Sequence, residues 1–290
     1  NEAMYNKVKN GDKYDVIIPS DYMIERMIRE DMLLKLDQSK IPNISKLANG
    51  VKGLAFDADN SYSIPYFWGN VGILYNPDEV SKEDVESEGW EVLRNEKYKG
   101  KLYMYDSERD SFMVALKALG YSMNTENEAE INEAYQWLKT LNDTMEPVYV
   151  TDEVIDNMIT GNKDLAVVYS GDGAYITDEN EDLVYYTPAE GTNIWCDAMV
   201  IPKTSENQEL AYKFINYMLD NEVGTSNTEE VGYASSNQEV LDEMTAEGGT
   251  FAENSAYLPR ENYEKDEVFH DNETIRKMLS DLWIKVKASQ

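Results

Sequence analysis

Short apolar runs alternate with helical patterns along this chain, and the alternation constrains the fold more than any other feature. The runs have the length of buried strands. They stand at residues 14–18, 71–75, 101–105, 165–169, 183–186 and 194–201. Between them, segments such as 107–119 and 131–141 carry apolar side chains three and four positions apart, as one helix face does. The pattern predicts an α/β architecture.

The length of 290 residues is enough for two domains. No Ser/Gly-rich linker separates them, so the strands that pass from one domain to the other have to join them, and such crossings act as hinges. The candidate crossings lie near Trp68, which we interpret as hinge packing, near Trp195 and near Val240. We expect lobe one to comprise 1–69 and 196–241, and lobe two 70–195 and 242–290.

The charge balance is strongly acidic. Asp and Glu outnumber Lys and Arg by 56 to 26, which gives a formal net charge of −30. Such a surface repels phosphate backbones and anionic lipid, and it attracts cationic solutes. The balance therefore argues against a nucleic-acid partner and against binding to a membrane surface, although solubility alone would also explain it.

Catalytic and metal-binding motifs have no positive support. Cys196 is the only cysteine and His270 the only histidine, so a His-based metal site or a Ser-His triad would have to use His270. Gly171-Asp172-Gly173 lacks the third glycine of a dinucleotide loop. The run that starts at Asp57 lacks the glycine and glutamate of a calcium loop. We expect neither an enzyme nor a cofactor or metal site, with a hydrolase that uses paired carboxylates kept as an alternative.

One extended segment, residues 193–197 (NIWCD), combines an aromatic and an acidic side chain. Residues two apart in a strand point to the same face, so Trp195 and Asp197 lie side by side. An indole face and a carboxylate together suit an organic cation. Taken alone, the pair is also explained by a core tryptophan beside a solvated aspartate.

Several further segments occur in a characteristic order with this pair. They are 15–22 (DVIIPSDY), 62–69 (YSIPYFWG), 119–122 (LGYS) and 231–233 (VGY). In order and spacing, the set resembles the bacterial spermidine/putrescine-binding proteins of ABC importers. The resemblance implies a type II periplasmic-binding-protein fold, in which two α/β lobes are joined by crossover strands and close over a ligand in a cleft.

The resemblance also implies a ligand site. The matching positions are Ser20, Tyr22, Ser107, Asp110, Tyr169, Trp195, Asp197, Tyr233 and His270. Asp197 and Asp110 would be the charge partners of ammonium groups, and the aromatic rings would line the methylenes. Each position has a simpler explanation too: Asp110 and Ser20 as helix caps, Tyr169 and Tyr233 as core residues, and His270 as a surface residue.

Two departures from the family pattern bear on this site. Ser107 stands where the family has an acid, and one carboxylate fewer fits a diamine or a shifted ligand register better than a triamine, unless Asp106 or Glu108 compensates. The family pattern also begins with a strand and a helix start that carry a Trp and a Tyr of the site and would precede Asn1.

The resemblance implies an extracytoplasmic receptor that captures spermidine or putrescine and delivers it to an ABC permease. We expect a monomer in the periplasm, or a lipoprotein anchored at the cell surface. The alternatives are a receptor for another organic cation or a small peptide, and a sensor that has kept the fold and lost transport.

Overall fold

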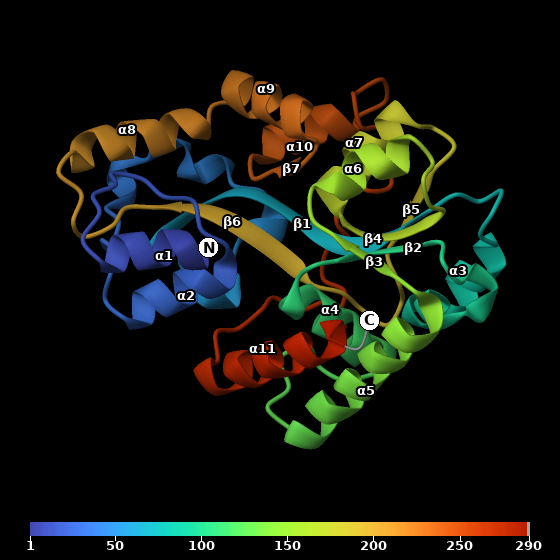
Figure 1. The fold of residues 1–290 in the computed structure, drawn as a ribbon. Helices are drawn as coiled ribbons and strands as arrows, with labels where there is room; N and C mark the ends of the chain where they lie inside the picture. The colour runs from blue at the N-terminus through green and yellow to red at the C-terminus, as the bar shows by residue number, and fades with distance from the viewer. Residues whose placement is uncertain (289–290) are drawn as a thin grey trace. The chain divides into compact units, whose positions relative to one another are not determined.

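The structure is a computed structural model that describes residues 1–288 (Figure 1). The chain forms two compact units. Unit 1 contains residues 1–69, 195–253 and 268–271, and unit 2 contains residues 70–194 and 254–267 and the chain from Asn272 onward. The chain passes from one unit to the other within β1 (Ser63–Tyr75) and at the start of β6 (Ile194–Val200).

The end of unit 1 differs from the expected boundary. Unit 1 continues to Glu253, where the sequence suggested a return to lobe two after Leu241. The reason is helix α10 (Gln238–Thr245), which buries Leu241 and Met244 against the same core, so the chain cannot leave within it. Phe251 then donates its N–H to the carbonyl of Met244 at 2.9 Å, which holds the following turn to that helix.

Unit 2 is built on an open sheet with the strand order β3-β2-β4-β1-β5. The strands besides β1 are β2 (Leu102–Tyr105), β3 (Val148–Val150), β4 (Leu165–Tyr169) and β5 (Val184–Tyr186). β2 is parallel to β3 and β4, whereas β1 is antiparallel to β4 and β5. Parallel neighbours need crossover connections, and helices supply them here.

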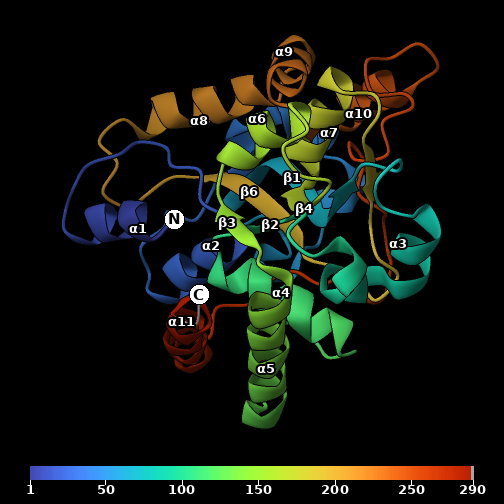
Figure 2. The ribbon, with the colours of Figure 1, turned by 45° about the vertical axis from the view of Figure 1, so that its right-hand side comes forward.

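The helices of unit 2 cover both faces of its sheet. They are α3 (Lys82–Glu88), α4 (Glu108–Ala118), α5 (Glu128–Met145), α6 (Glu153–Ile159), α7 (Ser170–Glu179) and α11 (Glu273–Lys287). α4, α5 and α11 lie on one face, and α6 and α7 lie on the other (Figures 1 and 2). Strands covered on both faces are apolar throughout, and Val71, Ile73 and Val168 are indeed fully buried.

Unit 1 consists mainly of helices packed around the segments of β1 and β6 that belong to it. The helices besides α10 are α1 (Glu2–Lys9), α2 (Asp21–Arg29), α8 (Gln208–Met218) and α9 (Asn221–Val231), and the short strand β7 (Ala234–Ser235) pairs with β1. α1 and α2 lie on one side of the strand segments, and α8, α9 and α10 lie on the other (Figure 1). Trp68 is 2% exposed and donates its indole N–H to the carbonyl of Ser235 at 3.1 Å.

The expected strand at 14–18 is wrong. In that run only Ile17 forms a bridge, an antiparallel one with Val200, with N–H···O distances of 3.1 and 2.9 Å. Ile18 is 41% exposed, and the next residue, Pro19, has no N–H to extend a ladder. The apolar run at 14–18 therefore forms one bridge instead of a strand.

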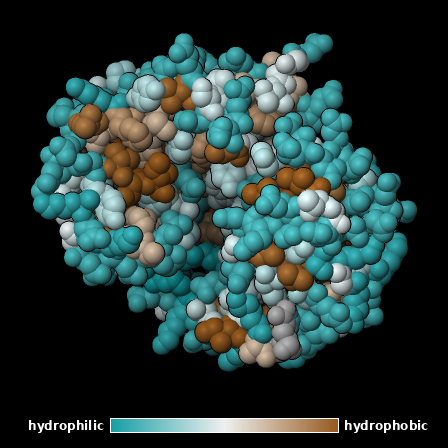
Figure 3. Space-filling view, turned by 45° about the horizontal axis from the view of Figure 1, so that its top comes forward, coloured by the Kyte–Doolittle hydropathy of each residue, from teal (hydrophilic) through white to brown (hydrophobic). Residues whose placement is uncertain are grey.

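The face drawn in Figure 3 is mostly hydrophilic and carries scattered hydrophobic patches. Among the described residues, none of the helices is apolar over a length that would span a bilayer.

Candidate functional site

Trp195 and Asp197 lie on β6 within unit 1, next to the segment that leads into α2. Ile17 and Ser20 of that segment form antiparallel bridges with Val200 and Asp197. The Ser20 hydroxyl donates to Oδ1 of Asp197 at 2.6 Å. Ser20 is the N-cap residue of α2, yet its side chain makes no capping hydrogen bond, so the hydroxyl is available to the carboxylate instead.

Trp195 of β6 belongs to an aromatic cluster. The ring of Trp195 lies 5.0 Å from that of Tyr233 at an angle of 64°, and Tyr233 lies 6.0 Å from Phe67 at 86°. These edge-to-face arrangements are the preferred ones for aromatic pairs. The structure thus brings together two of the predicted site residues of unit 1, Trp195 and Tyr233, adds Phe67, and places Asp197 two positions after Trp195 on the same strand.

Burial raises the pKa of Asp197, and the hydrogen bond from Ser20 opposes that rise. A carboxylate withdrawn from water is costly unless a cation or hydrogen-bond donors compensate it. An ammonium group at this position would therefore be stabilised by Asp197 and by the aromatic faces beside it.

Asp21 is a residue that sequence reasoning treated only as a helix start. It is 1% exposed, and its Oδ2 accepts the N–H of Cys196 at 3.0 Å while its Oδ1 accepts the N–H of Tyr22 at 2.6 Å. It therefore fastens the start of α2 to β6, which places Ser20 beside Asp197. Burial and the negative charges of Asp21 and Asp197 raise the pKa of the Cys196 thiol well above its usual range, so this cysteine stays protonated.

Two other predicted residues of unit 1 have contacts of a different kind. Tyr22 is buried, and its hydroxyl lies 3.4 Å from Oε1 of Glu2, a long hydrogen bond. His270 is exposed, and its Nδ1 lies 3.2 Å from Oε1 of Glu25. The next residue, Asp271, forms an ion pair with Arg29 at 2.5 Å, so His270 and Asp271 both contact charged residues of α2.

In unit 2, the predicted residues follow two neighbouring parallel strands. β2 ends at Tyr105, just before Ser107, and β4 ends at Tyr169. β2 and β4 are paired in parallel, so their carboxyl ends meet at one edge of the sheet. In open α/β sheets, ligands bind outside the carboxyl ends of the strands.

Asp110 is the centre of this second group. It is 5% exposed, and its Oδ2 accepts the hydroxyl of Tyr169 at 2.6 Å and that of Ser107 at 2.7 Å. The Ser107 oxygen also accepts the N–H of Asp110 at 3.4 Å, so Ser107 caps α4 as well. Burial raises the pKa of Asp110, and hydrogen bonds from Tyr169, Ser107 and Asn193 and the charge of Arg109 oppose the rise.

Three further residues of this group were not selected from the sequence. Tyr105 stacks on Tyr169 at 4.5 Å between ring centres, and its hydroxyl donates to Oδ2 of Asp172 at 2.5 Å. Asn193, which is 2% exposed, hydrogen-bonds to Asp110. The sequence contained signals for two of them: Tyr105, like Tyr169, stands at the end of its strand, and Asn193 is the polar start of the NIWCD segment. Asp172, by contrast, was tested only as part of a dinucleotide loop.

Of the two acids offered as substitutes at this edge, Asp106 is already engaged. Asp106 forms an ion pair with Lys287 at 2.5 Å. Within the described residues, no group of three or more His, Cys, Asp or Glu side chains is placed to hold a metal ion.

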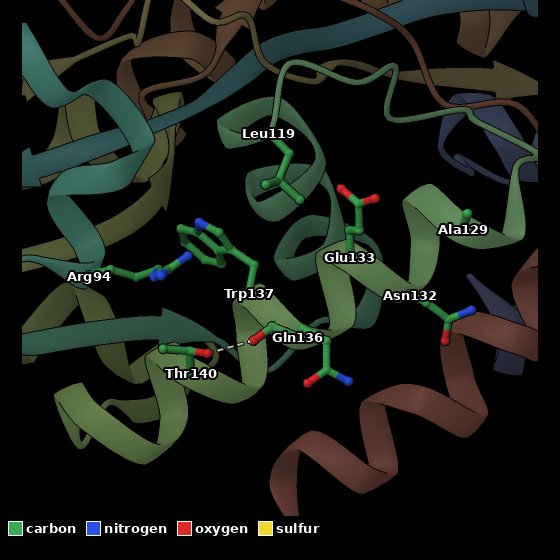
Figure 4. Close-up of a pocket in the computed structure, with 8 residues that line it drawn as sticks. All are labelled: Arg94, Leu119, Ala129, Asn132, Glu133, Gln136, Trp137 and Thr140. Atoms are coloured by element: carbon green, nitrogen blue, oxygen red, sulfur yellow. Dashed lines mark hydrogen bonds between the residues drawn. The ribbon is translucent and has the colours of Figure 1, made fainter.

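An open groove lies on α5 of unit 2, and its lining includes none of the predicted site residues (Figure 4). It is lined by Arg94, Leu119, Ala129, Asn132, Glu133, Gln136, Trp137 and Thr140. The guanidinium of Arg94 lies 5.2 Å from the centre of the Trp137 ring. Because a cation of the protein already occupies this aromatic face, the groove is not the expected cation site.

The site residues can now be set beside known proteins. The chain is 35% identical over 239 residues to the spermidine/putrescine-binding periplasmic protein of Escherichia coli (strain K12), which is 82% of this chain and 68% of that protein. It is 30% identical to the putrescine/cadaverine-binding protein of Pseudomonas aeruginosa, with 99% and 83% covered. These matches confirm the resemblance found in the motifs.

A solved structure agrees over almost the full length. The spermidine/putrescine ABC transporter substrate-binding protein PotD from Streptococcus pneumoniae superposes with a TM-score of 0.86 at 36% identity, covering 99% of this chain and 88% of that one. The expected α/β fold of a periplasmic binding protein is confirmed. The family described as bacterial extracellular solute-binding proteins matches residues 3–257. The chain therefore belongs to the bacterial extracellular solute-binding proteins.

Proposed function

We propose that this protein is the receptor of an ABC importer for polyamines, which binds spermidine or putrescine and passes it to the permease. The observation that carries the proposal is a carboxylate among aromatic residues in each unit, half-buried in unit 1 and buried in unit 2. Unit 1 has Asp197 with Trp195 and Tyr233, and unit 2 has Asp110 with Tyr169. The names of the relatives support the same class of ligand.

Each part of such a group matches a part of the ligand. A polyamine has ammonium groups separated by methylenes. A buried carboxylate neutralises an ammonium and accepts its N–H groups, and a ring face contacts both the ammonium and the adjacent methylenes. The hydroxyls of Ser20, Ser107 and Tyr169 hold the two carboxylates in place. We further propose that the protein performs no chemistry and works as a monomer outside the cytoplasm, anchored as a lipoprotein or in the periplasm.

Calorimetric titration tests the proposal. The protein is unfolded and refolded to remove bound ligand, and then titrated with spermidine, putrescine and an amino acid as control. We expect micromolar or tighter binding of at least one polyamine and none of the amino acid. Asp197→Asn, which keeps the shape of the side chain, should weaken binding by about 30-fold or more, since loss of a buried charge partner costs about 2–5 kcal/mol. Absence of binding heat with both polyamines would refute the proposed ligand.

A further inference from the structure

We propose that Asn193 is a ligand-binding residue of unit 2, whose side-chain oxygen accepts an N–H of the same ammonium group that Asp110 neutralises. The inference rests on the proposed function and adds a neutral acceptor to the site. Asn193 is not one of the positions that the family motifs indicate. Its buried and unpaired oxygen, held beside Asp110, carries the inference.

The oxygen of the Asn193 amide is closed to bulk water and has no partner. The residue is 2% exposed, and no group in the described part of the chain donates to its Oδ1. Among the side chains that the structure describes, three N or O atoms are in this state, and this oxygen is the only acceptor. Such atoms are rare in native proteins because an unpaired polar group withheld from water is unfavourable. The missing donor can then come only from a bound ligand or from a trapped water molecule.

The contact with Asp110 fixes which way the amide faces. An ionised carboxylate only accepts hydrogen bonds, so the hydrogen bond between the two side chains has to use the Nδ2 donor of Asn193. Oδ1 is bonded to the same carbon atom as Nδ2, which leaves it roughly 4–5 Å from the carboxylate oxygen. A single nitrogen can lie within hydrogen-bond distance of two oxygens at that separation.

The backbone on both sides of Asn193 is held within unit 2. Asn193 forms a parallel bridge with Glu267. The N–H of Ile194 donates to the Glu267 carbonyl at 2.7 Å, and the N–H of Glu267 donates to the Thr192 carbonyl at 3.0 Å. The Thr192 hydroxyl donates to the carbonyl of Val71 at 2.6 Å. Because these bonds oppose any shift of the segment, the amide oxygen is oriented before a ligand arrives, which lowers the cost of binding.

Two acceptors that share one nitrogen need a cation with at least two N–H donors. The terminal ammonium groups of spermidine and putrescine have three each. A tertiary ammonium has one N–H and a quaternary ammonium has none, so either would leave Oδ1 of Asn193 without a donor. Asp110 and Asn193 together therefore fit a primary ammonium group.

The direct test is a crystal structure of the wild-type protein with putrescine. We expect a ligand nitrogen within about 3.2 Å of Oδ1 of Asn193 and of a carboxylate oxygen of Asp110. A water molecule in place of the ligand nitrogen on Oδ1, or an ammonium at Asp110 that does not contact Oδ1, would overturn the inference and leave the proposed function standing.

Calorimetric titration of Asn193→Leu tests the same contact in solution. Leucine keeps the shape of the side chain and lacks both amide groups. The comparison is Ser107→Ala, which removes a hydroxyl that donates to Asp110 at 2.7 Å and opposes the rise of the Asp110 pKa more strongly than the amide does. If Asn193 only supported Asp110, its loss would therefore cost no more affinity than the loss of the Ser107 hydroxyl.

We expect the loss of putrescine affinity to be about tenfold larger in Asn193→Leu than in Ser107→Ala, since a hydrogen bond to the charged ligand is lost as well. Asn132→Leu, at an exposed asparagine of α5, is the matched control and should not change the affinity. Urea unfolding checks that each variant is folded before titration.

A loss in Asn193→Leu that is equal to or smaller than the loss in Ser107→Ala would overturn the inference alone. Failure of the wild-type protein to bind either polyamine would overturn the proposed function and this inference with it.

Discussion

The hydroxyl of Ser20 donates to the carboxylate of Asp197 at 2.6 Å, although the two residues are 177 positions apart in the chain. Ser20 stands at the N-cap of α2, where a serine ordinarily bonds to a backbone N–H of the first turn. Here the side chain stabilises a half-buried acid instead. The orientation of the Asp197 carboxylate is therefore fixed by a tertiary contact and not by the strand that carries it.

Replacing Ser20 by Ala is expected to raise the pKa of Asp197 further, because the hydrogen bond from this hydroxyl is the largest effect that opposes burial. A carbon-detected NMR titration of the aspartate carboxyl signals measures this directly. Polyamine affinity at neutral pH should fall by about 10-fold, since a hydrogen bond to a charged group is lost. Ser87→Ala, at an exposed serine on α3, is the matched control. An unchanged Asp197 pKa would contradict the assigned contact.

Ligand affinity should decrease as the pH falls. Burial raises the pKa of both Asp197 and Asp110 in the ligand-free protein, and an ammonium requires the ionised carboxylates. As the pH falls through the raised pKa values, affinity should therefore be lost. This loss should occur at a higher pH than the ordinary pKa of aspartate would give. Titrations over a pH series, repeated in buffers of different ionisation enthalpy, should also show proton release on binding near those values. A pH-independent affinity across that range would refute this prediction.

Asp197→Asn is expected to change the pH dependence of unfolding in a defined direction. A carboxyl whose pKa is raised in the folded state disfavours folding as the pH rises from its unfolded pKa through the folded pKa. Ligand-free Asp197→Asn should therefore be more stable than wild type at neutral pH, and this gain should shrink as the pH falls. Urea unfolding at several pH values measures the difference. A gain that grows on acidification would have the wrong sign.

Tyr169→Phe removes the hydroxyl that donates to Asp110 and keeps the ring stacked on Tyr105. We expect the pKa of Asp110 to rise, so the acid loss of affinity should move to higher pH. At neutral pH, affinity should fall by about 10-fold. Tyr217→Phe, on the exposed surface of α8, is the control and should leave the pH profile unchanged. A profile of Tyr169→Phe identical to wild type would contradict the prediction.

Lys117 is expected to be important for the stability of unit 2. Its side chain is 4% exposed, and its ammonium pairs with Glu267 and donates to the carbonyl of Lys265 at 2.7 Å. Burial of Glu267 opposes ionisation, but the bonds from Lys117, Ser122 and the Met123 N–H lower the pKa of this acid.

Lys117→Met should reduce the free energy of unfolding by about 3–5 kcal/mol, as when one partner of a buried ion pair is removed. Urea denaturation measures it, and Lys139→Met, in an exposed pair with Asp143 on α5, should have little effect. Equal effects of the two substitutions would contradict the importance assigned to burial.

Much of unit 2 could be predicted from its sequence. The runs at 101–105 and 165–169 became β2 and β4, because apolar strands between helical segments have one stable arrangement, with both faces covered. Capping was also readable: the Ser107-to-Asp110 spacing is a capping pattern, and Ser107 does cap α4. These features depend on residues close together in the chain.

The sequence by itself determined the alternation of strands and helices, the shared face of Trp195 and Asp197, and the motifs of the family. Only the tertiary structure decided that the run at 14–18 forms a single bridge, that Ser20 serves Asp197, and that Asp172 meets Tyr105 beside Tyr169. The physical reason is how far apart in the chain the interacting residues stand. Local spacing sets backbone conformation and the direction of side chains, whereas a hydrogen bond between distant residues depends on how whole elements pack, which no single segment encodes.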